Sequence, residues 1–279
     1  MLITVNGLVI RSYPSGNHDS VLHILTDTNG KLTVMVKGGG SKKNSSSAGY
    51  IQLLTYGNYE IYQGKDDLYW LRGGSVIESF FTLTNDLSSM ALANYLCEVA
   101  SECSRENFEI EDTHVLLRLL LNSLYMLKTG GRSVSVVKGV FELRVCAMLG
   151  YTPDLIGCAD CGEAFPDEAY LDVMNGRFVC SACQAKRNRA LSLTQIREED
   201  EFRQRRVICH LSSSVLAAMR YALSAPDKRI FSFTLQGEEE GSFERVCETF
   251  LLHHLERDFK TLEFYRSTPD LDKLVGKGG

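Results

Sequence analysis

The segment VLHILTDTNGKLTVMVK, residues 21–37, indicates how the first part of the chain folds. Apolar side chains recur at every second position in its second half, at Leu32, Val34 and Val36, which is the period of a strand with one buried face. The dipeptide Asn29-Gly30 lies between the two halves and readily adopts the positive φ angles of a tight turn. The segment therefore predicts a β-hairpin.

Three more apolar runs extend this pattern, at residues 3–11, 50–62 and 68–77. The stretch 38–48 between them is too rich in Gly, Ser, Lys and Asn to form a regular element. Five strands within the first 80 residues suit a small closed barrel, and the OB-fold is the leading candidate. An SH3-like barrel or a small sandwich would show the same pattern.

After residue 80 the apolar residues follow a helical period, which predicts helices over 86–103, 113–128, 134–149, 213–223 and 243–259. The predicted fold class is α+β and multidomain: an N-terminal OB-fold barrel followed by a helical domain with an inserted four-cysteine zinc module. The predicted divisions are the barrel at 1–80, helical parts at 81–155 and 191–265, the module at 156–190 and a tail at 266–279.

Two C-x-x-C pairs, Cys158–Cys161 and Cys180–Cys183, lie 18 residues apart. Each pair in a tight turn brings two sulfurs together, and two such turns close a tetrahedron around one Zn²⁺. Four protein ligands leave no position for substrate, so this zinc is expected to be structural. A thioredoxin-like redox pair and a metal-free cluster are the alternatives. Other cysteines among apolar residues at helical spacing are expected in the core.

The net charge of −5 (30 basic against 35 acidic residues) hides a local basic window. No acid occurs between Asp27 and Glu60, and this window contains four lysines: Lys31, Lys37, Lys42 and Lys43. Arg11 and Arg72 lie on other predicted strands. Six aromatic residues also fall between positions 50 and 70, and about half of them are expected to fill the barrel. Cations combined with aromatic platforms are typical of barrels that bind single-stranded nucleic acid.

A second basic segment follows the cysteines, with Lys186, Arg187 and Arg189 close to further arginines at 203–206. It could extend a DNA path, bind an acidic protein tail, or be an ordinary solvated face.

Catalytic and targeting motifs are absent from the sequence. It has no G-x-x-x-x-G-K-[ST] loop, no H-E-x-x-H and no zinc-deaminase signature, so nothing supports an enzyme. It has neither a signal peptide pattern nor a 20-residue apolar stretch, which predicts a cytoplasmic protein that does not contact a membrane.

Three stretches resemble the bacterial recombination mediator family RecO. They are Gly7–Ser12 (GLVIRS), Gly30–Gly38 (GKLTVMVKG) and Phe141–Leu155, which begins FELR and ends LGYTPDL just before Cys158. The family often has an arginine-rich stretch after Lys-Gly, where this chain has Gly39-Gly40-Ser41 followed by Lys42-Lys43.

The resemblance implies a non-enzymatic DNA-repair factor of the RecF-type pathway. Such proteins bind single- and double-stranded DNA, anneal complementary strands and contact the C-terminal tail of single-strand-binding protein. They act with RecR, and in some pathways RecF, to load RecA, and they work in the cytoplasm at the nucleoid. On this basis the expected phosphate contacts are Arg11, Lys31, Lys37, Lys42 and Lys43. A zinc-ribbon regulator that reads specific duplex DNA and a protein-binding scaffold are the alternative functions.

Overall fold

The computed structural model describes residues 1–16, 19–38, 49–64, 68–104, 110–193 and 207–268. The chain forms two compact units. The barrel unit is Met1–Val134 together with the segment from Phe259 onward, and the cysteine unit is Ser135–Asp258. The finer division into five parts expected from the sequence stays a prediction. Lys42 and Lys43 lie outside the described residues.

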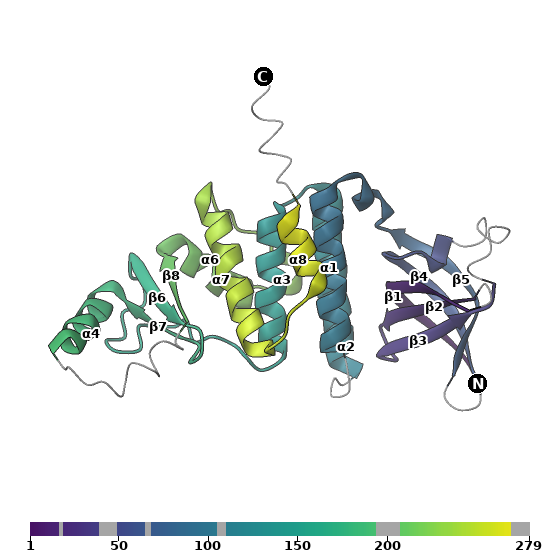
Figure 1. Cartoon of the computed structure of the whole chain (residues 1–279), viewed down its shortest axis with the longest axis horizontal. Coiled ribbons are helices and arrows are strands. Elements are labelled where there is room, and N and C mark those ends of the chain that lie inside the picture. The colour runs from purple at the N-terminus through teal and green to yellow at the C-terminus, as the bar shows by residue number, and fades with distance from the viewer. Residues whose placement is uncertain (17–18, 39–48, 65–67, 105–109, 194–206, 269–279) are drawn as a thin grey trace, which may run out of the picture. The chain divides into compact units, whose positions relative to one another are not determined.

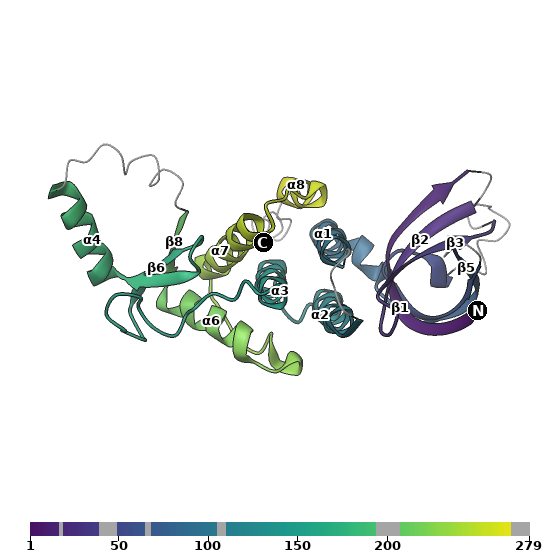
Figure 2. The same ribbon diagram turned by 90° about the horizontal axis from the view of Figure 1, so that it is seen from below.

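Five strands close the barrel in the order β1-β2-β3-β5-β4, because β4 also pairs with β1 (Figures 1 and 2). The strands are β1 (Leu2–Ser15), β2 (Asp19–Thr26), β3 (Lys31–Val36), β4 (Thr55–Gln63) and β5 (Tyr69–Ser79). Every pairing is antiparallel except β3 with β5.

The predicted hairpin is confirmed as β2 and β3. Only Gly30 of its turn has a positive φ, of 67°. Both the backbone N–H and the hydroxyl of Thr26 donate to the Gly30 carbonyl, at 2.9 and 2.6 Å. The side chain of Thr26 thus closes the loop, which the Asn-Gly dipeptide by itself did not indicate.

Side chains along each strand point in turn to the inside and the outside of the barrel, and the inward ones fill it. The buried core cluster is Val5, Val9, Leu22, Ile24, Leu32, Val34, Val36, Tyr59 and Ile61. Tyr50 and Tyr69 pack against this cluster, so three of the six aromatic residues belong to the core, as expected. Of the other three, Tyr62 is exposed, and Tyr56 and Trp70 are half-buried.

The strand predicted at 50–62 begins later than expected. Residues 49–51 form a 3₁₀ turn, and Leu54 has a φ of 63°, which interrupts extended backbone before Thr55. The hydroxyl of Tyr59 donates to the Tyr50 carbonyl at 2.8 Å and ties this turn to the barrel wall. Apolar side chains at Tyr50 and Ile51 therefore serve the core from a turn.

Among the described residues, three α-helices complete the barrel unit: α1 (Leu87–Cys103), α2 (Ile110–Thr129) and the short α8 (Lys260–Ser267). Asp86 caps α1 by accepting from the Ser89 N–H at 2.7 Å. Phe259 is buried edge-on against Tyr95 of α1. The Glu98 carboxylate accepts from the Thr261 N–H at 3.0 Å, so α1 also caps the start of α8.

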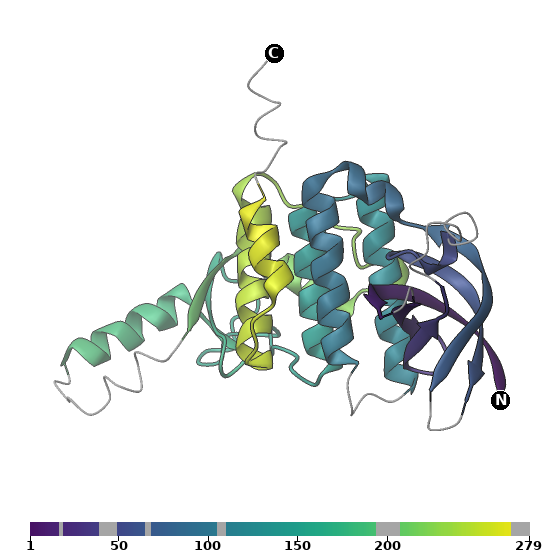
Figure 3. The same ribbon diagram turned by 45° about the vertical axis from the view of Figure 1, so that its right-hand side comes forward.

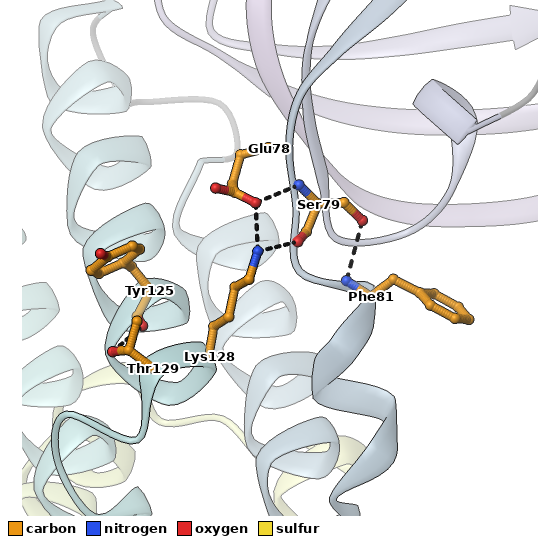
Figure 4. A network of polar contacts seen from close by, with 6 residues as sticks. All are labelled: Glu78, Ser79, Phe81, Tyr125, Lys128 and Thr129. Atoms are coloured by element: carbon orange, nitrogen blue, oxygen red, sulfur yellow. Dashed lines mark hydrogen bonds and ion pairs between the residues drawn. The ribbon is translucent and has the colours of Figure 1, made fainter.

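Lys128 of α2 joins the end of β5 to the helices (Figure 4). Its ammonium donates to the Glu78 carboxylate at 2.7 Å and to the Ser79 carbonyl at 3.0 Å. The Lys128 hydrogen bond lowers the pKa of Glu78 below its usual value. The same ammonium lies 5.9 Å from the Phe80 ring centroid.

Lys128→Met is expected to destabilise the barrel unit by about 0.5–1 kcal/mol, the range for a partly exposed pair. Urea unfolding followed by the fluorescence of Trp70, the sole tryptophan of the chain, measures this change. Because Glu78 titrates with a lowered pKa, its share of the stability is present above the unfolded carboxyl pKa. That share is lost as pH falls through the folded value. A variant as stable as the parent at pH 7 would contradict this role.

The cysteine unit combines helices with a small sheet. Its helices in the part that the structure describes are α3 (Val134–Met148), α4 (Ser181–Leu193), α6 (Ser213–Ser224) and α7 (Glu238–Leu255). The sheet has the order β7-β6-β8, with β6 (Glu168–Asp172), β7 (Arg177–Cys180) and β8 (Ile208–Ser212). Ser212 caps α6 by accepting a hydrogen bond from the Val215 N–H at 3.2 Å. The helix expected over 243–259 ends at Leu255, because Glu256 is left-handed, with a φ of 47°.

Lys138 is buried between α3 and α7 with no exposed side-chain surface. Its ammonium lies 2.9 Å from the Glu142 carboxylate, 2.6 Å from Glu248 and 3.7 Å from Glu244. Burial by itself lowers the pKa of Lys138, but the three carboxylates outweigh it and raise that pKa above its usual value. Gly139, next to Lys138, allows Phe243 of α7 to pack closely against α3, since a Cβ at position 139 would lie 2.5 Å from the Phe243 ring.

No helix among the described residues is long and apolar enough to cross a membrane.

Candidate metal centre and nucleic-acid interface

The four predicted cysteines come together in the cysteine unit. The Sγ atoms of Cys158, Cys161, Cys180 and Cys183 all lie within 4.8 Å of one another and form the cysteine centre. Cys161 Sγ and Cys180 Sγ are 3.8 Å apart. Sulfurs about 2.3 Å from a tetrahedral Zn²⁺ would be about 3.8 Å apart, so the spacing fits a metal of that size.

The first pair lies in a tight turn that follows a loop in which only Pro153 and Leu155 are buried. The Gly162 N–H donates to the Cys158 carbonyl at 2.8 Å, and Gly162 has a φ of 79°. Gly157 is also needed, since a Cβ there would lie 2.8 Å from the Gly162 carbonyl oxygen. Burial raises the pKa of the Cys158 thiol, but backbone N–H groups, that of Cys180 foremost, donate to it and lower the pKa to about 6. The turn is therefore built to hold a thiolate.

The second pair begins at the junction of β7 and α4. Cys180 ends the strand and Cys183 lies in the first turn of the helix. A redox-active C-x-x-C has this local arrangement, which was one alternative reading. The approach of all four sulfurs instead favours a metal ion, because a redox pair does not need the other two cysteines. Cys158, Cys180 and Cys183 are buried, and Cys161 is exposed.

Two arginines hold the centre from outside. Arg187 of α4 donates two hydrogen bonds to the Asp160 carboxylate, at 2.7 and 2.5 Å, and so joins the second pair to the first. Arg220 of α6 donates to the carbonyls of Leu155 and Ala164, each at 2.6 Å. It thereby fixes both ends of the first turn to a helix. Neither partnership was expected from the sequence, although Arg187 follows Cys183 by four residues and so shares its helix face.

The predicted phosphate-binding residues of the barrel differ in their contacts and exposure. Lys31 donates to the Ser101 carbonyl of α1 at 2.5 Å, so it joins the barrel to a helix. Arg11 is exposed on β1, with its guanidinium 5.5 Å from the Tyr13 ring centroid. Lys37 is exposed just after β3, with its ammonium 5.0 Å from the Trp70 ring centroid.

Lys37 belongs to a row of cations and aromatic rings on the outside of the barrel. Trp70 of β5 pairs with Tyr62 of β4, and the Arg72 guanidinium lies 5.1 Å from the Tyr62 ring centroid. Their neighbours Ile61 and Leu71 belong to the core, so side-chain alternation turns these residues outward. The row Lys37, Trp70, Tyr62 and Arg72 is called the outer stripe below.

The fold and the cysteine centre define an α+β protein whose four cysteine thiols are placed to bind a metal ion. The family model for the N-terminal part of recombination protein O matches residues 1–80, and the C-terminal model matches residues 84–196. The chain belongs to the RecO family, as the motifs predict.

Relatives that carry the name "DNA repair protein RecO" match from about two thirds to nearly all of the chain. The protein of Acetivibrio thermocellus is 28% identical over 272 residues, which is 98% of each chain. That of Symbiobacterium thermophilum is 28% identical over 94% of this chain and 96% of its own. The Bacillus pumilus protein is 30% identical over 67% of this chain and 70% of its own. A role in DNA repair follows from this membership.

Proposed function

We propose that this protein is a non-enzymatic recombination mediator that holds DNA strands on an OB-fold barrel. In this proposal it binds single- and double-stranded DNA and anneals complementary strands. It cooperates with RecR, and in some pathways with RecF, to load RecA, and it contacts the C-terminal tail of single-strand-binding protein. It acts in the cytoplasm at the nucleoid. The barrel (1–80), the zinc module (156–190), the helical parts (81–155 and 191–265) and the tail (266–279) are its proposed functional divisions.

The outer stripe is the observation that carries the proposal. Two exposed cations stand beside two aromatic rings on adjacent strands, within reach of one extended strand of nucleic acid. Exposed cation–π contacts contribute about 0.5–1 kcal/mol each. Stacking of a base on an aromatic ring contributes about 1–3 kcal/mol, and the cation that the base displaces from the ring binds a phosphate of the same strand. Exchanging the internal contact for a bound strand is therefore favourable.

The stripe suits a protein that binds strands of any sequence. Every base has a face that can stack on Trp70 or Tyr62, and phosphates repeat in every sequence. Annealing requires that two strands be held close and released as a duplex, and it involves no covalent step. Among the five predicted phosphate contacts, Arg11 and Lys37 keep this role in the proposal. Lys42 and Lys43 stay predictions, and Lys31 is the weakest of the five because it contacts Ser101.

We also propose that the cysteine centre holds one structural Zn²⁺. Four thiolates around Zn²⁺ leave a net charge of −2, which favours cations and N–H donors nearby. Arg187 and the backbone N–H groups around Cys158 supply them. Zinc prefers tetrahedral sulfur ligands, and four of them leave no position for a reacting water.

Lys37→Gln with Arg72→Gln is expected to weaken binding of a 30-nucleotide oligo(dT) strongly at low salt. Each lost phosphate contact lowers the log–log salt slope by about 0.7, so the pair lowers it by about 1.4. Stacking on Trp70 is measured directly, because this sole tryptophan is quenched when a base covers it. Titration of the unmodified protein with oligo(dT) is therefore expected to quench the tryptophan fluorescence.

The matched control is Lys260→Gln with Arg266→Gln, which removes the same charge from exposed positions on α8 in the same unit. It should leave both the slope and the quenching unchanged. Tight, salt-sensitive binding without quenching would move the site away from the outer stripe. No salt-dependent binding of any oligonucleotide would leave the protein-binding scaffold as the better function.

A further inference from the structure

The helix α4 has little to bury. From Ala185 to Ala190 every side chain is exposed, and α4 projects from the small sheet in each view (Figures 1–3). Its contacts include the cysteine centre, through Cys183, Asp160, through Arg187, and the strands β6 and β7. A helix that is polar on its exposed turns gains little from apolar burial, which normally stabilises short helices in proteins. The cysteine centre thus anchors an element whose surface is offered to solvent.

The sequence window that contains α4 is basic and lies between acidic stretches on either side. Between Asp172 and Glu198 the sequence has no acidic residue and five basic ones: Arg177, Lys186, Arg187, Arg189 and Arg197. The protein as a whole has a net charge of −5, so this window is an exception. A concentration of one sign of charge on an oppositely charged protein favours binding of a polyanion.

The helix separates these cations by face. Arg187 lies four residues after Cys183, on the side of the cysteine centre, and is held by Asp160. Lys186 and Arg189 are three residues apart, so they share another face, and both are exposed. One arginine therefore fixes the helix, and two cations face outward on it.

We propose that α4 is a second contact for the phosphate backbone of nucleic acid, through Lys186 and Arg189. It holds a further strand in addition to the strand on the barrel, and in this it rests on the proposed function. The exposed turns of α4 offer charge and small polar side chains but no apolar anchor. A repeating phosphate chain needs only charge, whereas an acidic peptide normally needs an anchor in a pocket.

The test measures capture of a second strand. The full-length, metal-loaded protein is bound to an immobilised oligo(dT), and a labelled, non-complementary strand is then added. Lys186→Gln with Arg189→Gln is expected to reduce capture at least about tenfold and to lower its salt slope by about 1.4. Quenching of Trp70 by the first strand and the metal content should stay as in the parent.

The matched control is Lys228→Gln with Arg229→Gln, two exposed cations on another element of the same unit. It should capture the second strand as the parent does. A complementary gain is expected from Ala185→Lys, which adds a cation four residues before Arg189 and should raise the slope by about 0.7. This second variant keeps the test decisive if the first one loses its metal.

Capture that is equal in the parent and in both α4 variants would overturn the inference and leave the barrel proposal intact. Loss of binding to a polyglutamate peptide, with DNA capture unchanged, would also overturn it in favour of an acidic protein partner. If the α4 double variant loses capture while the Lys37→Gln, Arg72→Gln variant still binds and quenches like the parent, the inference stands and the barrel site fails.

Discussion

Removal of the metal from the cysteine centre is expected to unfold the segment from Asp154 to Leu193 and to leave the barrel folded. The double substitution Cys158→Ser with Cys161→Ser removes two of four ligands. Structural zinc contributes about 10–16 kcal/mol of apparent binding energy in zinc-finger peptides, which matches or exceeds the stability of most domains. The three short strands around the centre have too small a core to replace that contribution.

Elemental analysis should find about one zinc per chain in the parent protein and none in the double variant. Hydrogen exchange should rise across β6, β7 and α4, while the fluorescence of Trp70, which lies in the barrel, stays unchanged. Cys209→Ser is the matched control, since this cysteine is on β8 of the same sheet but outside the centre. A metal-free double variant with parent-like protection of α4 would show that the centre does not need a metal.

Lys138→Met is expected to destabilise the cysteine unit by about 3–5 kcal/mol. The substitution removes the buried ammonium that lies beside the Glu142 carboxylate, which has no exposed side-chain surface. Because the pKa of Lys138 is raised in the folded state, its contribution is fully present below the ordinary lysine pKa. The contribution disappears only as pH rises through the folded value, so it is constant near neutral pH.

Urea unfolding followed by circular dichroism measures this loss. Adding Glu142→Met to Lys138→Met should recover most of it, because replacing a buried pair by apolar groups of similar volume is often neutral. Glu244 and Glu248 remain partly exposed and can be hydrated. Lys260→Met, at an exposed position, should change stability by less than about 0.5 kcal/mol. A Lys138→Met variant within 1 kcal/mol of the parent would mean that the carboxylates need no counter-charge.

The elements with a regular spacing of apolar residues were predicted from the sequence. Alternation at Leu32, Val34 and Val36 located a strand, and helical spacing located α1 and α3 to within a few residues. The sheet in the cysteine unit was missed because its strands have only four or five residues. The helix α4 was missed because it has no apolar period to detect.

The candidate sites divide in the same way. The cysteine centre was predictable because C-x-x-C spacing is local and specific. The role of Lys31 was not, since its partner Ser101 is 70 residues away in sequence. The outer stripe falls between these cases: Trp70, Tyr62 and Arg72 were candidates, but only strand register brings them together with Lys37.

The return of the chain to the barrel unit has a consequence for synthesis on the ribosome. Glu98 caps a helix that lies 163 residues further along, and Tyr95 packs against Phe259 from the same distant segment. At a synthesis rate of about 5–20 residues per second, these partners are made about 8–30 s after α1. The unit that starts first is therefore the last to be completed. A chain cut after Asp258 would retain every described element of the cysteine unit yet leave α1 with an uncovered apolar face.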